Sequence, residues 1–229
     1  MTVKAMLKSF AFLFILVIAN GHARQPLPAS RFEHLTGIKM NSESKSAWDA
    51  KYNRPNFVFG KRPADFLAEN YHYLPFEGTV LDMGMGEGRN AVFLAQKGFK
   101  VTGVDISSVA VKKAHLLAKE YGVKIKGVVA SMIDYKIPPG SYDAIICFYY
   151  VDRNLLEKIK TWLRPGGILI YESHTTRQRI HPSHRHDPVD FFLKEQELLK
   201  MFSGMRVLKY EEPLHEKNFR SSIILQKPQ

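Results

Sequence analysis

Three glycines alternate with other residues after an apolar run that ends in an aspartate, and the next apolar run ends in a second aspartate. The residues are Asp82, Gly84, Gly86, Gly88 and, after the second run, Asp105. Glycine lets a backbone pass close to a ligand, because a Cβ atom there would collide with it. A helix that starts near Arg89 would point unpaired N–H groups at an anionic group. The pattern predicts a strand–loop–helix–strand unit for a nucleoside-like ligand, with Asp105 accepting hydrogen bonds from two ribose hydroxyls.

The glycine spacing narrows the choice of ligand. Dinucleotide sites use Gly-x-Gly-x-x-Gly, whereas this chain has Gly-x-Gly-x-Gly, one residue shorter. Asp82 stands two residues before the first glycine, and its negative charge suits an ammonium group better than a pyrophosphate. S-adenosylmethionine (SAM) has an ammonium group, a carboxylate, a ribose and an adenine. SAM is therefore the predicted cofactor, with a dinucleotide site and a plain glycine-rich turn as alternatives.

Four segments of the chain match motifs of a known family. They are Leu81-Asp82-x-Gly84-x-Gly86-x-Gly88-Arg89-Asn90, Phe93-Leu94-Ala95-x-x-Gly98-x-x-Val101-Thr102, Leu163-Arg164-Pro165-Gly166-Gly167 and Trp48-Asp49-x-x-Tyr52. With them the chain resembles class I SAM-dependent methyltransferases, and it is most similar to their tellurite-resistance and thiopurine-type branch. The resemblance covers about residues 47 to 228.

The resemblance implies a set of cofactor-binding residues. They are Asp82, Gly84, Gly86, Gly88, Arg89, Asn90, Asp105, Ile106, Ser131, Met132 and Tyr149. Relatives place an acidic residue near the adenine amino group directly after the third strand. Here that position holds Ser131, and Asp134 follows three residues later. Met132 is expected either to contact adenine or to pack in the core.

Aromatic residues and possible bases supply the candidates for acceptor binding and catalysis. The expected acceptor-binding residues are Trp48, Tyr52, Phe59, Tyr150 and Arg177, and the candidate bases are His174, His215 and Asp152. Tyr149 and Tyr150 could flank a sulfonium, whose positive charge favours aromatic faces. Asp152 is also placed to cap the following helix. The Asn/Asp-Pro-Pro-Tyr turn of enzymes that methylate exocyclic amines of DNA bases is absent from this position.

A stretch rich in histidine and arginine, residues 174–187, follows the fifth expected strand. One interpretation is a lid that recruits an oxyanion or a thiolate through charge-assisted hydrogen bonds. A second is a metal site made by His181, His184 and His186, and a third is a solvated basic loop. No spacing brings the three rings together, so no metal is predicted.

Apolar runs and helical segments alternate along the chain. Strands are expected near 79–83, 100–105, 125–130, 142–148, 167–173, 205–211 and 219–227, and helices near 61–73, 88–97, 107–121, 152–164 and 194–202. Continuous apolar strands that alternate with helices predict an α/β fold with a parallel sheet covered on both faces. The family resemblance implies a Rossmann-like, seven-stranded, mostly parallel sheet whose last two strands form an antiparallel hairpin.

Charge and cysteine content limit the partners. The formal charge of +11 favours anionic small substrates, anionic membranes or nucleic acid. The single cysteine, Cys147, lies in an apolar run, which excludes an internal disulfide and predicts a small core residue.

The N-terminus reads as a leader. Lys4 and Lys8 precede an apolar run over residues 10–19, and small residues at 21 and 23 suit a cleavage site. The expected organisation is a signal peptide at 1–23, a flexible linker at 24–45 and one domain at 46–229. Ten apolar residues are too few to span a bilayer. Export is therefore expected, with a cytoplasmic protein starting at Met40 as the alternative.

These observations predict SAM-dependent methyl transfer to a small-molecule acceptor, and the positive charge of the chain favours an anionic one. A thiol or a metalloid oxyanion is implied by the family resemblance. The alternatives are an RNA or protein methyltransferase and an exported, non-catalytic binding protein that keeps the fold. No nucleic-acid partner is expected, and the sequence assigns no oligomeric state.

Overall fold

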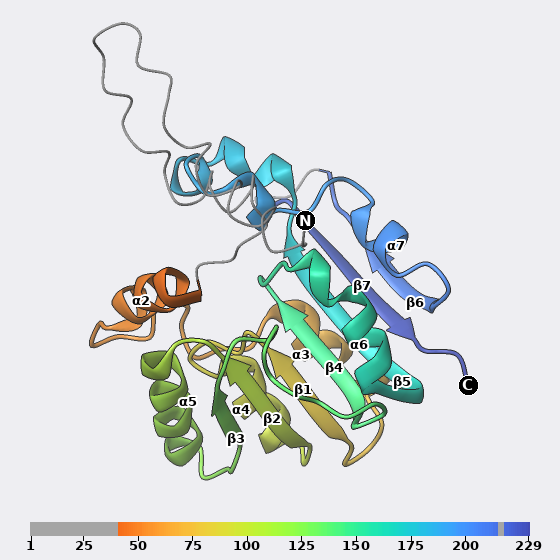
Figure 1. Cartoon of the computed structure of the whole chain (residues 1–229), viewed down its shortest axis with the longest axis horizontal. Helices are drawn as coiled ribbons and strands as arrows, with labels where there is room; N and C mark the ends of the chain where they lie inside the picture. The colour runs from red at the N-terminus through yellow and green to blue at the C-terminus, as the bar shows by residue number, and fades with distance from the viewer. Residues whose placement is uncertain (1–40, 215–217) are drawn as a thin grey trace, which may run out of the picture. The chain divides into compact units, whose positions relative to one another are not determined.

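Seven strands form one mixed sheet in the order β3-β2-β1-β4-β5-β7-β6. They are seen in the computed structural model, which describes residues 41–214 and 218–229 (Figure 1). Their bounds are β1 Thr79–Met83, β2 Lys100–Asp105, β3 Lys126–Val129, β4 Tyr142–Phe148, β5 Leu163–His174, β6 Arg206–Glu211 and β7 Arg220–Gln226. The first five strands pair in parallel, and β7 is antiparallel to both β5 and β6. The predicted sheet, with its antiparallel C-terminal hairpin, is confirmed.

Helices cover both faces of this sheet. They are α2 Asn41–Tyr52, α3 Asp65–Asn70, η2 Tyr71–Tyr73, α4 Arg89–Gln96, α5 Ser108–Glu120, η3 Arg153–Leu155, α6 Leu156–Trp162, η4 Thr176–Ile180, η5 Pro182–His184, η6 Val189–Phe191 and α7 Glu197–Met201, where η marks a 3-10 helix. In Figure 1, α6 lies in front of the sheet, and α3 and α4 lie behind it.

The central strand β4 shows why its sequence is apolar from Ala144 to Phe148. Ala144 and Ile146 pack with residues of α3 and α4 on one face. Ile145 and Cys147 pack with residues of α6 and α7 on the other face. Since successive side chains of a strand point to opposite faces, a strand with two covered faces needs apolar residues throughout. The prediction that Cys147 is a core residue is confirmed, because its side chain is fully buried.

Element ends differ from the sequence expectations where side chains compete with the helix. The helix expected from residue 61 begins at Asp65, because Ala64 is still extended and its N–H donates to the Oδ1 of Asn90. The helix expected over 152–164 divides into η3 and α6. Ser107 caps α5, since its side chain accepts a hydrogen bond from the N–H of Ala110.

Helix α2 begins at Asn41, inside the range 24–45 for which the sequence predicts a linker. The predicted boundary is therefore late, and an ion pair between Lys45 and Asp49, one turn apart, helps to explain the helix. The predicted signal peptide and residues 24–40 lie outside the described residues. Within the described ranges, none of the helices combines the length and the apolar character needed to cross a bilayer.

Candidate active site

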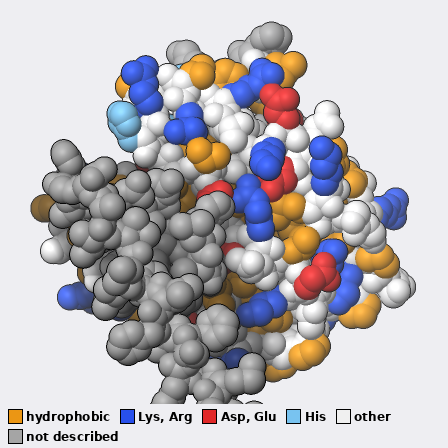
Figure 2. Space-filling view, turned by 45° about the horizontal axis from the view of Figure 1, so that its top comes forward, with side chains coloured by type: hydrophobic (Ala, Val, Ile, Leu, Met, Phe, Trp, Pro, Cys, Tyr) orange, Lys and Arg blue, Asp and Glu red, His pale blue; other side chains and the backbone are white. Residues whose placement is uncertain are grey.

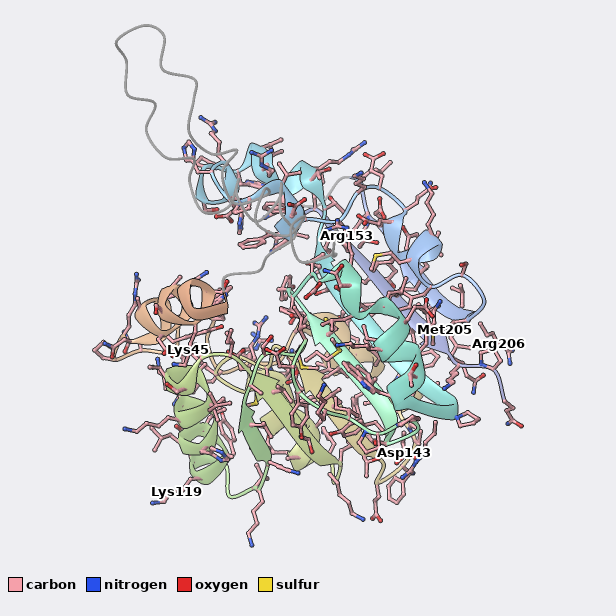
Figure 3. The ribbon with its side chains drawn as sticks, viewed as in Figure 1. Lys45, Lys119, Asp143, Arg153, Met205 and Arg206 are labelled. Carbon is pink, nitrogen blue, oxygen red and sulfur yellow. The ribbon has the colours of Figure 1, made fainter. Side chains whose placement is uncertain are left out.

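Most of the predicted site residues that the structure describes follow the carboxyl ends of β1, β2, β4 and β5. Figure 3 shows the two ends of β4: Arg153 lies beyond the carboxyl end, and Asp143 lies near the opposite end. Ligands of open α/β sheets bind at the carboxyl edge. A hollow of about 540 Å³ lies at the other edge, and none of the predicted site residues lines it. The carboxyl edge is therefore the candidate site.

The glycine loop follows β1 in a left-handed backbone conformation. Gly84, Gly86 and Gly88 have φ angles of 64°, 55° and 83°, which residues with a Cβ atom rarely adopt. A Cβ atom would lie 3.0 Å from the Tyr150 ring at Gly84 and 2.9 Å from the Tyr52 hydroxyl at Gly86. At Gly88 it would lie 2.6 Å from the Cβ of Ala114, on α5. The structure thus gives a reason for glycine other than the one expected, namely close neighbours within the protein, and Gly88 packs one helix against another.

Asp105 holds the glycine loop from the end of β2. Its Oδ2 accepts a hydrogen bond of 2.8 Å from the N–H of Gly86, and its Oδ1 accepts one of 2.8 Å from the N–H of Ser107. Each carboxylate oxygen can accept a second hydrogen bond. The carboxylate is oriented from both sides and keeps acceptor capacity, as a partner for two ribose hydroxyls requires.

Asp82 is a buried carboxylate near the end of β1, just before the glycine loop. The side chain is 2% exposed, and its Oδ2 has no hydrogen-bond partner among the described residues. Burial and the neighbouring charge of Asp105 raise the pKa of Asp82 to about 8. A buried acceptor without a donor fits a ligand that brings an ammonium group, so the residues of this site fit SAM.

The pH dependence of stability tests this state of Asp82. The pKa of Asp82 in the folded chain, about 8, exceeds the ordinary value of 3.8. The stabilisation from its bound proton is therefore fully present below the ordinary value and is lost as pH rises through about 8. In that window one bound proton corresponds to about 1.4 kcal/mol of unfolding free energy per pH unit. Urea unfolding at several pH values should show this loss in the wild-type protein and not in Asp82→Asn. Equal slopes in the two proteins would contradict the assignment.

Arg89 and Asn90 lie at the start of α4 but serve different purposes. The guanidinium of Arg89 lies 5.6 Å from the centroid of the Tyr149 ring and donates a hydrogen bond to the carbonyl of Phe59. Asn90 is 5% exposed and holds the start of α3 through Ala64. Arg89 thus borders the site, while Asn90 contributes indirectly, by fixing the start of α3.

The residues expected around adenine are only partly brought together. Ile106 follows Asp105 directly and is half-buried. Ser131 closes a turn, because its hydroxyl accepts a hydrogen bond from the N–H of Ile133. Met132 is 3% exposed and belongs to the core cluster of the α6 face, so the alternative of core packing holds for it.

Tyr149 and Tyr150 separate after β4. Tyr149 has a left-handed φ of 58°, which is uncommon for a residue with a side chain and marks functional sites. Its hydroxyl donates a 2.7 Å hydrogen bond to the Oε1 of Glu172. Tyr150 turns back over Gly84. The structure therefore places Tyr149 toward β5 and Tyr150 over the glycine loop.

Asp152 behaves as a helix cap. Its Oδ1 accepts hydrogen bonds from the backbone N–H and the side-chain amide of Asn154, at 3.1 and 3.0 Å. These contacts support the interpretation that Asp152 caps η3. They do not support Asp152 as a catalytic base.

His174, at the end of β5, lies among side chains that bear on its protonation. Its ring centroid is 4.8 Å from that of Tyr149 and 5.2 Å from that of His184. Burial, followed by the charge of His184, lowers the pKa of His174 to about 4. The ring makes a hydrogen bond to the backbone of Phe219, whereas its Nδ1 is buried without a partner among the described residues. The imidazole is therefore neutral near pH 7, with a lone pair on Nδ1.

The stretch 174–187 folds into short 3-10 helices beside His174. His184 is oriented by Asp187, since its Nδ1 lies 3.0 Å from a carboxylate oxygen. Arg177 pairs with Glu195 at the exposed surface. In the described part of the chain, no three metal-ligating side chains come together. His215 lies outside the described residues.

Two polar residues of the site were not predicted. Glu172 is fully buried, and it accepts hydrogen bonds from Tyr149 and, at 2.6 Å, from the hydroxyl of Ser222. Glu172 and Ser222 are partners in the antiparallel register of β5 and β7. A carboxylate inside an apolar strand pattern was the available signal for Glu172, because such a residue is rarely buried without partners.

The expected aromatic residues Trp48, Tyr52 and Phe59 form one cluster. Trp48 stacks on Tyr52 with 5.6 Å between ring centroids, and Phe59 meets Tyr52 edge-on at 6.1 Å. Tyr52 is 5% exposed and lies over Gly86. The cluster therefore covers the glycine loop.

Comparisons with known proteins agree with this geometry. Residues 80–167 match the family described as "Methyltransferase domain". A ubiquinone biosynthesis O-methyltransferase of Chromobacterium violaceum is 30% identical over 100 residues, which cover 41% of this chain and 43% of that protein. TehB from Haemophilus influenzae has a TM-score of 0.59 at 18% identity, covering 80% of this chain and 66% of that chain.

A third similarity is to a structure solved for the conversion of a disulfide bond into a thioacetal group during echinomycin biosynthesis. It has a TM-score of 0.66 at 21% identity and covers 81% of this chain and 92% of that chain. At such identities the two structures show the fold alone. The chain spans less than two thirds of the length of the curated relatives it matches. The family match shows that the chain contains a methyltransferase domain over residues 80–167. Its fold is that of solved SAM-dependent methyltransferases, and SAM is the cofactor that the glycine loop fits.

Proposed function

We propose that this protein transfers a methyl group from SAM to a small-molecule acceptor that carries an ionisable O–H or S–H group. Thiols and metalloid oxyanions belong to this class. The observation that carries the proposal is the neutral His174 beside Tyr149. The Nδ1 of His174 has no hydrogen-bond partner among the described residues. The 30% identity to an O-methyltransferase of ubiquinone biosynthesis supports a small acceptor.

Positioning and proton removal are the tasks left to the protein. Bound SAM supplies a methyl group on a positively charged sulfur, which leaves as a neutral thioether. Holding the acceptor in line with that methyl group provides most of the acceleration. The Nδ1 of His174 takes up the proton that the O–H or S–H group of the methyl acceptor loses. An imidazole that is neutral at pH 7 has the lone pair on this nitrogen available. Glu172 fixes Tyr149, whose ring forms one wall next to His174.

Replacing His174 with glutamine is expected to lower kcat by about 100-fold for a hydroxyl acceptor, because a positioned general base contributes at least that much. The effect should be smaller for a thiol that is already ionised at the assay pH. Because the pKa of His174 is about 4, wild-type activity should not fall as pH drops from 8 to 6 through loss of this base. Formation of S-adenosylhomocysteine and of the methylated acceptor, followed by mass spectrometry, measures the rates.

The control is His72→Gln, which removes an exposed histidine next to α3. This variant should keep wild-type activity. An unchanged kcat in His174→Gln with a hydroxyl acceptor would contradict the role of His174. Methylation of RNA or protein, with catechols, thiols, selenite and tellurite all inert, would overturn the acceptor class.

The mixed charges on the face shown in Figure 2 favour a small acceptor over nucleic acid. On the face shown in Figure 2, lysine and arginine side chains are interspersed with acidic and apolar ones and do not form one continuous stripe. Nucleic-acid binding relies on clustered positive charge and weakens steeply with salt. Measuring RNA binding at low and high salt tests this point, since tight and salt-dependent binding would favour the RNA alternative.

We also propose that the N-terminal leader directs export of the protein. Cell fractionation followed by N-terminal sequencing should give a mature chain that starts at Arg24. A cytoplasmic chain that starts at Met40 would contradict export.

A further inference from the structure

A strap formed by residues 52–59 crosses the glycine loop. Tyr52 ends α2, and its hydroxyl lies against Gly86. Phe59 packs edge-on against Tyr52, and its carbonyl accepts a hydrogen bond from Arg89. The strap therefore lies over the backbone that faces the cofactor.

Glu87 ties the strap to the glycine loop itself. It stands between Gly86 and Gly88 and is 4% exposed. Its Oε2 accepts hydrogen bonds from the N–H groups of Val58 and Phe59, at 2.7 and 3.4 Å. The side chain that the glycine motif leaves variable thus binds the strap.

Lys113, on α5, contacts both Glu87 and the strap. Its ammonium lies 2.5 Å from the Oε1 of Glu87, with both side chains largely buried. It also donates hydrogen bonds to three strap carbonyls, those of Tyr52, Arg54 and Asn56, at 3.2, 3.0 and 2.8 Å. One buried cation therefore joins the strap, the glycine loop and α5.

A second anchor holds α2, which precedes the strap. Figure 3 shows Lys45 of α2 near one end of α5 and Lys119 at the other end. At the end near α2, Asp49 accepts a 2.6 Å hydrogen bond from the hydroxyl of Ser107. The N–H of Ser107 in turn donates to Asp105. The position of α2 is thus linked to the carboxylate expected to bind the ribose.

We propose that Glu87 and Lys113 form a clasp that holds the strap 52–59 closed over the glycine loop and sets the rate at which the cofactor leaves the site. A ligand on the glycine loop lies beneath the strap, so its release requires the strap to move. Movement separates Lys113 from its acceptors and Glu87 from its donors. Breaking a buried ion pair is unfavourable, so the clasp keeps the site closed. Both residues are positioning residues, and the inference rests on SAM binding alone, whatever the acceptor.

Replacing Lys113 with methionine tests the clasp, with Lys112→Met as the matched control. Lys112 is an exposed neighbour on the same helix, so both variants lose one positive charge. Trp48 stacks on Tyr52 at the start of the strap, and Trp162 is buried in the core. In a Trp162→Phe background, Trp48 fluorescence therefore reports on the strap. Stopped-flow displacement of S-adenosylhomocysteine then gives the dissociation rate.

We expect dissociation to be about tenfold faster in Lys113→Met, which is about 1.4 kcal/mol of barrier, and unchanged in Lys112→Met. Hydrogen exchange in the peptide over residues 52–59, measured without cofactor, should speed up in Lys113→Met alone. Equal dissociation and exchange rates in the two variants would overturn the clasp.

If Lys113→Met does not fold, Glu87→Gln provides the same test. It removes the ion pair but keeps an oxygen for the N–H of Val58, so faster dissociation is again expected and a wild-type rate contradicts the proposal. A wild-type protein that binds no S-adenosylhomocysteine would refute the cofactor site. The hydrogen-exchange comparison would still decide whether the clasp holds the strap.

Discussion

Replacing Asp105 with asparagine should weaken SAM binding by about 10³-fold, about 4 kcal/mol. The expected loss comes from two hydrogen bonds between a charged acceptor and the ribose hydroxyls, each worth about 1.5–3 kcal/mol. The Asp105 carboxylate also accepts hydrogen bonds from the N–H groups of Gly86 and Ser107. The substitution therefore disturbs the loop as well as the ribose contact. Isothermal titration calorimetry with SAM measures the affinity.

Two controls separate cofactor binding from folding. Asp65→Asn changes an exposed aspartate at the start of α3 and should leave the affinity unchanged. Thermal unfolding of Asp105→Asn without ligand shows whether the fold survives. A folded Asp105→Asn protein with the affinity of the wild type would refute the predicted ribose contact.

Replacing Gly88 with alanine should destabilise the protein by about 3 kcal/mol, from backbone strain and overpacking together. The new Cβ would lie 2.6 Å from the Cβ and 3.1 Å from the Cα of Ala114, and φ at Gly88 is +83°. Chemical unfolding measures the change. For a chain of this size we expect the Tm to fall by about 10 °C.

Two further variants separate the contribution of backbone strain from the contribution of overpacking. Gly98 has a φ of +91° and open space around it, so Gly98→Ala should show the backbone strain alone, about 1 kcal/mol. Adding Ala114→Gly to Gly88→Ala removes the steric overlap and should recover part of the lost stability. A Gly88→Ala protein as stable as Gly98→Ala would contradict the close packing of the glycine loop on α5.

The central elements were predictable because local pattern and tertiary environment agree there. In β4, a continuous apolar run is what two covered faces require, and the expected range 142–148 matches the strand. Asp105 could be placed at a strand end from the run that precedes it. The glycine spacing likewise led to the loop between β1 and α4.

The remaining features depend on contacts between distant residues. Lys113 and Glu87 form an ion pair although they are 26 residues apart in the sequence. Neither residue lies at the end of a strand. The partnership of Glu172 with Ser222 depends on the antiparallel register of β5 and β7. No local pattern encodes these pairings, because they arise only when the sheet and its helices have assembled.

On the acceptor side of the site, too, some features follow from local sequence and others depend on contacts between distant residues. His174 was a candidate because it follows an expected strand. Its fixed neutral form, by contrast, depends on burial and on its neighbours Tyr149 and His184. Arg177 is a candidate by its place in a basic loop, and its ion pair with Glu195 could not be predicted from that loop.

Calorimetric titration of the full-length wild-type protein with SAM, in parallel with Asp105→Asn, tests directly whether the glycine loop binds SAM. We expect saturable binding at one SAM per chain in the wild-type protein, weakened by about 10³-fold in the variant. Absence of binding to the wild-type protein at millimolar SAM would contradict SAM as the ligand of this site.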